Sequence, residues 1–137
     1  MTHTEKKAFL RSFHSINSEL TRLAMERDRL KTRLAFIADG LDKHTLSATL
    51  EQIYTDIEKR MADLLAARSA VYEAIDSVND DRCRTLLRLR YLERLSPLQV
   101  SMKLYLCQRQ YYRLQNKALN SMTVPTKRNI KNSVKTV

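Results

Sequence analysis

The first part of the chain carries one long apolar repeat, which restricts the possible folds more than any other feature. From Phe9 the apolar residues are spaced alternately by four and three positions, interrupted only at Arg27: Phe9, Phe13, Ile16, Leu20, Leu23, Leu30, Leu34 and Ile37. Positions so spaced fall on one helical face, so the series predicts a helix of about thirty residues with a heptad seam. Asp39 and Gly40 follow. Gly40, the only glycine, is expected to end this helix in a left-handed cap.

A second apolar run has the same helical spacing and comprises Leu46, Leu50, Ile53, Ile57, Met61, Leu64, Val71, Ile75 and Val78. Thr45 or Ser47 is expected to cap its start. Because roughly six residues connect the runs, we expect a long, coiled-coil-like antiparallel hairpin over residues 1–79. Two helices make a thin core, so the hairpin should recruit another helix from the C-terminal part or from a second copy. We interpret it as a spacer or oligomerisation segment and expect a homodimer through these helices.

The bulk composition favours an all-α protein of the cytoplasm. The 137 residues include one glycine and two prolines, whereas good helix formers are abundant. No stretch of about 18 apolar residues is present, so no membrane span is predicted, and the start lacks the apolar segment of a secretory signal. Cys83 and Cys107 form no CxxC motif and are expected to be free thiols, which fits the cytosol.

Charge is distributed unevenly along the chain. Residues 1–81 contain 12 Lys and Arg against 14 Asp and Glu, whereas residues 82–137 contain 13 Lys and Arg against one acid, Glu93. The formal net charge of the whole chain is +10. Such an asymmetry predicts that the C-terminal part meets an anionic partner, either a nucleic acid or an anionic membrane.

Residues 80–122 have the layout of a helix-turn-helix domain. Asn79, Asp80 and Asp81 supply caps for a support helix, "DRCRTLLRLRYLERL", and Ser96 followed by Pro97 is a strong helix start. The apolar set of this second helix is expected to be Leu98, Val100 and Leu104, with Met102 in reserve. A turn at Tyr105 and Leu106 precedes a third helix, capped by Cys107 and running from about Gln108 to Met122. The basic tail, 123–137, is expected to be disordered.

The third helix has two faces with different chemistry. Tyr111, Leu114, Ala118 and Leu119 form the side expected to pack inward. The other sides carry long donors and no acid: Gln108, Arg109, Tyr112, Arg113, Asn116 and Lys117. Arg can bond guanine at two atoms, and Gln and Asn can do the same for adenine. This pattern predicts a helix that enters the major groove of double-stranded DNA.

The stretch "LLRLRYLERLSPLQVSMKLYLCQRQYYRLQNKAL" resembles region four of bacterial sigma factors. It is even more similar to the sigma-region-four-like domain of phage-encoded ArpU/RinA-type transcriptional regulators, through its "LLxxRY" support helix and "RQxxRLxxKAL" ending. The resemblance covers roughly residues 82–122. It implies a late-gene activator that can work with bacterial RNA polymerase. It also implies DNA-facing roles for Gln108, Arg109, Tyr112, Arg113 and Lys117, and backbone contacts from Arg88 and Arg90.

Three residues in the second helix of this domain and the turn that follows it depart from this family pattern. Cys107 stands where Ser or Thr is usual, which weakens the helix cap. Tyr105 stands where Gly is common, so the turn must differ or Tyr105 must tolerate strain. Ser101 replaces a usual Ala. Gln108 and Tyr112 also replace residues that are often charged, so the DNA sequence read cannot be transferred from the family.

Other function classes find little support in the sequence. His3, His14 and His44 lie on different segments, and no carboxylate pair or Cys–His set has a usable spacing, so an enzyme is not expected. No cofactor motif and no metal-ligand cluster is visible. Two alternatives to a regulator stay open. One is a DNA-packaging recognition protein similar to a small terminase subunit, and the other is a polymerase-binding module that does not read DNA.

Overall fold

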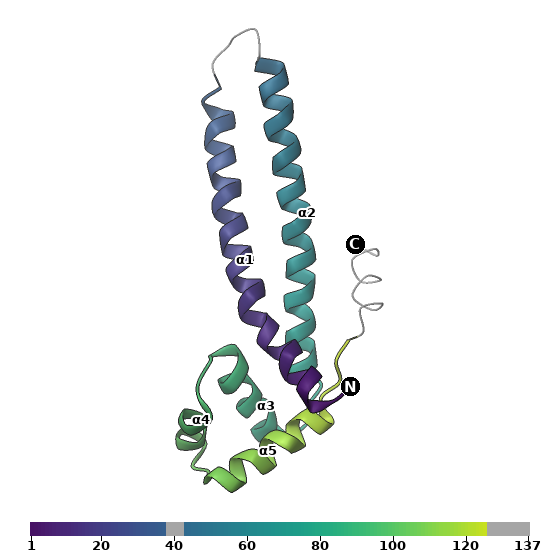
Figure 1. Cartoon of the computed structure of the whole chain (residues 1–137), viewed down its shortest axis with the longest axis vertical. Helices are drawn as coiled ribbons and strands as arrows, with labels where there is room; N and C mark the ends of the chain where they lie inside the picture. The colour runs from purple at the N-terminus through teal and green to yellow at the C-terminus, as the bar shows by residue number, and fades with distance from the viewer. Residues whose placement is uncertain (38–42, 126–137) are drawn as a thin grey trace.

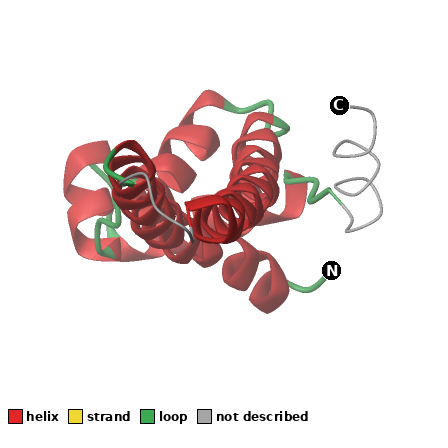
Figure 2. Cartoon of the chain, turned by 90° about the horizontal axis from the view of Figure 1, so that it is seen from above, coloured by secondary structure: helices red, strands yellow, loops and turns green. Residues whose placement is uncertain are grey.

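The computed structural model describes residues 1–37 and 43–125, and these ranges form an all-α fold. Its elements are α1 (His3–Ala35), α2 (Lys43–Asp76), α3 (Asp81–Leu87), the π-helical turn η1 (Arg88–Leu92), α4 (Pro97–Leu104) and α5 (Gln108–Ser121). Helices α1 and α2 form the expected long antiparallel hairpin (Figure 1). The short helices gather at its base, beside the N-terminus (Figures 1 and 2).

The ends of the hairpin helices differ from the sequence expectation. The Thr2 side chain caps α1 by accepting a hydrogen bond of 3.2 Å from the Glu5 N–H. Helix α1 ends at Ala35, before Asp39 and Gly40, which lie outside the described residues. The last turn tightens there, because the Phe36 N–H approaches the carbonyls of both Thr32 and Arg33.

Helix α2 begins earlier than predicted. It starts at Lys43, so Thr45 and Ser47 both lie inside the helix and neither is its cap. Thr45 instead supplies a carbonyl that accepts the Thr49 hydroxyl one turn later. The apolar spacing identified the helix correctly but could not locate its first residue.

The upper part of the hairpin has the thin core that two helices alone can provide. Both helices contribute to its buried residues, which are Leu20, Leu23 and Leu30 from α1 and Leu50, Ile57 and Leu64 from α2. Leu46 and Ile53 belong to the apolar run that predicted α2, but they are 50% and 43% exposed. A single partner helix covers only a narrow stripe of α2, so apolar residues at the edge of that stripe stay in contact with solvent.

The base of the hairpin has a second, better shielded core that includes the C-terminal helices. Leu10, Val71 and Val78 from the hairpin pack with residues from the short helices, namely Leu86, Leu87, Tyr91, Val100, Tyr111, Ala118 and Leu119. The hairpin therefore recruits its additional helices from its own chain. Residues 1–79 and 80–122 share this core, so they are not separate packing units.

The support helix of the C-terminal part changes its winding halfway. As predicted, Asp80 caps its start, and the Asp80 Oδ1 atom accepts the N–H groups of Arg82 at 2.9 Å and Cys83 at 3.1 Å. After Leu87 the helix widens into η1, where the Glu93 N–H bonds the Arg88 carbonyl at 3.0 Å. This extra residue in the turn changes the direction in which the following side chains leave the helix.

The helix pair α4–α5 begins at the predicted Ser-Pro signal. Ser96 Oγ accepts the Gln99 N–H, and the Gln99 side chain accepts the Ser96 N–H, which completes a capping box. Tyr105 tolerates the strain expected of a residue other than glycine in this turn, because it adopts the left-handed conformation with φ 56° and ψ 46°. Its side chain is 94% exposed.

The predicted inner face of α4 was partly wrong. Leu98 and Met102 are 70% and 69% exposed, whereas Val100 and Ser101 are buried and Leu104 is half-buried. Leu98 lies two residues from Val100, which is more than half a turn around a helix, so both cannot face one core. Ser101 takes an inward position and its hydroxyl donates to the Pro97 carbonyl at 2.8 Å. The small side chain of Ser101 therefore suits this inward position.

The start of the tail is packed against the hairpin, contrary to the expected disorder from residue 123. The Thr123 N–H donates to the Ser77 hydroxyl at 2.9 Å, and Val124 contacts the base core. Residues 126–137 lie outside the described part of the chain.

The shared base core predicts that the two halves of the chain unfold together. Leu10 is 0% exposed, so Leu10→Ala should lower the free energy of unfolding by about 2–5 kcal/mol. Leu46→Ala, at a half-exposed site, should change it by only about 0.5 kcal/mol. Urea unfolding followed by circular dichroism and by tyrosine fluorescence measures both. Separate transitions in the Leu10→Ala variant would contradict a common core.

The left-handed turn predicts a stabilising substitution. A side chain with a Cβ costs about 1–2 kcal/mol at this conformation, and the exposed Tyr105 ring gives little in return. Tyr105→Gly should therefore raise the melting temperature, although the greater freedom of glycine in the unfolded chain reduces the gain. Tyr105→Ala keeps the Cβ and serves as the control. Equal melting temperatures for the two variants would show that the turn stores no such strain.

Candidate nucleic-acid interface

Helix α5 lies across the base of the hairpin, at the opposite end of the molecule from the last turn of α1 and the first turn of α2 (Figure 1). Its inner side is held by Tyr111, Ala118 and Leu119, which are buried as predicted, while Leu114 is half-buried. Gln115 is also buried and was not predicted to be, because a polar residue gives no apolar signal in the sequence. The base core therefore fixes which side of α5 faces outward.

All six residues predicted on the outer side of α5 are exposed: Gln108, Arg109, Tyr112, Arg113, Asn116 and Lys117. With 100° between successive residues, Arg109, Arg113 and Asn116 lie opposite the buried side. Gln108 and Tyr112 lie toward α4, since both line a groove between the two helices. The Tyr112 ring stands edge-on against the buried Tyr111 ring, with 5.0 Å between centroids. This contact restricts the orientation of an exposed aromatic side chain.

Lys117 lies at the other edge of this surface and already has an anionic partner. Its Nζ is 3.2 Å from Asp80 Oδ2, at the start of α3. The Cys83 N–H and Lys117 together hold the pKa of the Asp80 carboxyl below its ordinary value. Contact between Lys117 and a phosphate would have to compete with this exposed ion pair, which is a weak interaction.

Arg88 and Arg90 do not join the outer surface of α5. Arg88 lies 3.0 Å from Asp76 Oδ1 at the end of α2. Arg90 is half-buried, donates to the Leu95 carbonyl at 3.3 Å and lies over the Tyr91 ring. Both residues belong to the widened turn η1, so the regular helix assumed from the sequence does not describe their directions.

The turn before α5 is held by two contacts that the sequence analysis missed. Cys107 occupies the cap position, and the Gln110 side chain accepts the Cys107 N–H at 3.0 Å. The Arg82 guanidinium donates to the Leu104 carbonyl at 3.3 Å, at the end of α4. Gln110 from α5 and Arg82 from the support helix thus stabilise the turn around Cys107, which is a weaker cap than Ser or Thr.

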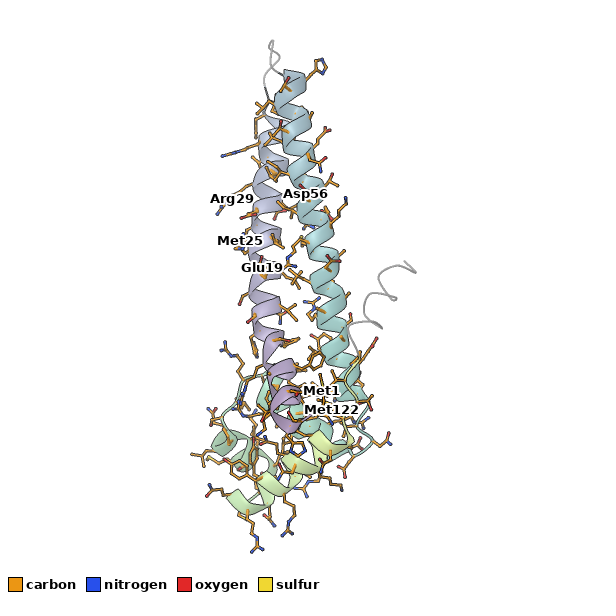
Figure 3. The ribbon with its side chains drawn as sticks, turned by 45° about the vertical axis from the view of Figure 1, so that its right-hand side comes forward. Met1, Glu19, Met25, Arg29, Asp56 and Met122 are labelled. Atoms are coloured by element: carbon orange, nitrogen blue, oxygen red, sulfur yellow. The ribbon has the colours of Figure 1, made fainter. Side chains whose placement is uncertain are left out.

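The far end of α5 is held by the first turn of α1. Lys6 Nζ donates to the carbonyls of Leu119 at 2.6 Å and Met122 at 3.0 Å, which places a cation at a helix C-terminus. The His3 Nε2 and Asn120 Oδ1 atoms are 2.5 Å apart. Figure 3 shows Met1 beside Met122 in the same region. No local pattern could reveal these contacts, because their partners are more than a hundred residues apart in sequence.

Other kinds of site are not seen within residues 1–37 and 43–125. No three His, Cys, Asp or Glu side chains in these ranges gather as metal ligands would. Of the described helices, none combines the length and apolar character needed to cross a bilayer. Cys83 is buried and Cys107 is exposed, and both thiols are free.

The comparisons with known proteins give one match. No curated protein and no solved structure matches the chain. A family described as "Protein of unknown function (DUF1492)" matches residues 42–123, the segment that contains α2, the support helix, α4 and α5. Because this match covers more than half of the chain, the protein belongs to the DUF1492 family.

Proposed function

We propose that this protein is a sequence-specific DNA-binding transcriptional regulator of a phage or prophage. The observation that carries the proposal is the exposed side of α5, which combines two arginines with amides and a tyrosine and carries no carboxylate. No Asp or Glu follows Glu93 in the sequence, so nothing on α4 or α5 repels a polyanion. A helix that served solubility alone would gain nothing from such a bias.

The chemistry of this surface suits the major groove, which admits one α-helix. Arg109 and Arg113 are one helical turn apart and project from the same side of α5 as Asn116. These three are the proposed base-reading residues, because Arg recognises guanine and Asn recognises adenine by paired hydrogen bonds. Gln108, Tyr112 and Lys117 lie at the edges, where phosphates border a groove, and are proposed as backbone contacts.

Affinity in this proposal comes mainly from phosphate contacts and the release of counterions. The resemblance to sigma region four and to ArpU/RinA-type regulators supports a role in activating late phage genes in the bacterial host cytoplasm. In that role the protein would work with the host RNA polymerase. Arg88 and Arg90 are not part of the proposed DNA surface, since their described contacts lie with Asp76 and with the Leu95 carbonyl.

A second candidate function is supported by the outer side of α4. Leu98, Met102 and Tyr105 are exposed there, beside a groove that also contains Tyr112. Apolar side chains gathered on a surface are typical of protein contacts. They favour the polymerase-binding module as the alternative. A measurement of DNA binding distinguishes the two functions, because only the regulator is expected to read DNA.

The DNA proposal predicts a specific loss when one arginine is removed. Arg113→Ala should weaken binding to a preferred duplex by about 1–3 kcal/mol if Arg113 contacts a base, and binding to scrambled duplex far less. The measurement is a fluorescence-anisotropy titration over a salt series, using DNA from upstream of the late operon of the same genome. Arg60→Ala removes the same charge from an exposed position in the middle of α2 that does not line the groove between the hairpin helices, and should bind like the wild type.

The outcomes separate the candidate functions. Equal losses on both duplexes would assign Arg113 to phosphate. If Arg109→Ala combined with Arg113→Ala binds as tightly as the wild type at every salt concentration, α5 does not read DNA. The interaction module would then be the better explanation.

The thin upper core supports the proposed homodimer. Leu46 and Ile53 are exposed along α2, and Ile53 lines a groove of about 460 Å³ with residues of α1. Glu26 and Arg33 also line this groove, so a second copy could meet both an acid and a base. Covering these apolar side chains would favour association.

Solution mass tests the association. Sedimentation velocity should give a dimer for the wild type, and Ile53→Lys should shift it to a monomer with unchanged helix content. Thr55→Lys, at an exposed position that does not line this groove, provides a comparison for the charge alone. A ring of many subunits would instead favour the DNA-packaging alternative, and a wild-type monomer would exclude the hairpin as a dimer interface.

A further inference from the structure

A polar cavity of about 550 Å³ lies where the hairpin meets the C-terminal helices, and the proposed DNA surface does not include it. Its walls come from α1, η1, the segment that connects η1 to α4, and the first turn of α4, and no residue of α5 contributes. The lining residues that matter chemically are Arg11, His14, Arg90, Arg94, Ser96 and Gln99. The cavity volume falls within the range of small-molecule sites, about 300–1,000 Å³.

The charge of this cavity is uncompensated. Three arginines line it, and among the described residues no Asp or Glu does. Arg11, Arg90 and Arg94 form no ion pair in the part of the chain that the structure describes. Like charges that line one space repel each other, and an anion bound among these arginines would reduce that repulsion.

The arginines occupy different depths in the cavity. Arg11 and Arg94 are exposed, whereas Arg90 and His14 are half-buried, and the His14 Nε2 is 2.7 Å from the Tyr91 carbonyl. Burial raises the pKa of the Tyr91 hydroxyl, and the charges of Arg90 and Arg11 oppose that rise. Arg90 from η1 and Arg11 from α1 therefore both lower the pKa of the same hydroxyl group, that of Tyr91.

The start of α4 adds little direct bonding to this cavity. The capping box already uses the N–H groups of Ser96 and Gln99, and Pro97 has none. A ligand would therefore be held by the guanidinium groups, with the α4 dipole as a minor favourable field. Arg94 has a left-handed backbone with φ 59°, a conformation that a side chain with a Cβ adopts at a cost.

We propose that this cavity binds a small phosphate-bearing anion and thereby ties α1 to the DNA-binding helices. Guanidinium groups match phosphate oxygens through paired hydrogen bonds, and three of them can neutralise a doubly charged group. A single carboxylate would leave most of the positive charge uncompensated. The ligand is either free phosphate or the phosphate group of a small molecule.

Thermal unfolding of the full chain tests this site. Inorganic phosphate should raise the melting temperature by about 4 °C at ten times Kd, while sodium chloride of equal ionic strength should have a much smaller effect. Adenosine 5′-monophosphate forms the second arm. Tighter binding of the nucleotide would indicate a phosphorylated small molecule, and equal or weaker binding would indicate free phosphate.

Variants decide whether the cavity is responsible. Arg11→Gln and Arg94→Gln should each weaken phosphate binding at least tenfold, measured by calorimetry, with Arg29→Gln as the matched control. Arg94→Gly relieves the left-handed strain, so this variant should melt higher than the wild type without ligand and yet lose the phosphate response. That combination separates loss of the site from loss of the fold.

Two results would overturn the proposal. One is a melting temperature that responds to phosphate no more than to chloride, and the other is phosphate binding unaffected by changes at Arg11 and Arg94. Arg113→Gln should leave phosphate binding intact. If it abolishes binding instead, the anion occupies the α5 surface, which would support DNA binding and refute the separate cavity.

Discussion

The packing of the hairpin base against the short C-terminal helices is the interaction on which the rest of the structure depends. Leu10 and Val71 are fully buried there together with Tyr111 and Leu119. Among the described residues, the core of the upper hairpin is formed by α1 and α2 alone. Because this core fixes the inner side of α5, it also determines which arginines and amides remain exposed. The base of the hairpin therefore holds the candidate interface on α5 in place, while the rest of the hairpin extends away from it.

Sequence patterns predicted the features that arise from neighbouring residues. Asp80 and Ser96 cap their helices as expected, because a cap needs only a side chain and the N–H groups two or three positions later. The exposed side of α5 also followed from helical spacing. The inward face of α4 did not, since in an eight-residue helix the choice between Leu98 and Ser101 depends on what packs against it. Likewise, the arginine-lined cavity forms only because α1 and η1 pack together. The spacing of apolar residues in the sequence does not predict which distant elements pack together.

Ion pairs reduce the number of free cations around α5 and its support helix. Lys117 is beside Asp80 and Arg88 is beside Asp76, so acids of the balanced N-terminal part partly neutralise the basic C-terminal part. Arg109 and Arg113 have no such partner among the described residues and stay at the centre of the outward side. Among the described residues, the arginines without an ion pair include Arg109 and Arg113 on the outer surface of α5, and Arg90 and Arg94 beside the cavity at the hairpin junction.

The contacts of Lys6 and His3 with the end of α5 have a consequence for the order of folding. The α1–α2 hairpin closes through pairs that are near in sequence, so it can form while the chain is still being synthesised. Its base cannot be completed then, because the carbonyls that accept hydrogen bonds from Lys6 belong to Leu119 and Met122, more than a hundred residues later. During that interval an apolar surface at the hairpin base stays uncovered. Synthesis of α5 closes it and at the same moment orients the outward-facing arginines.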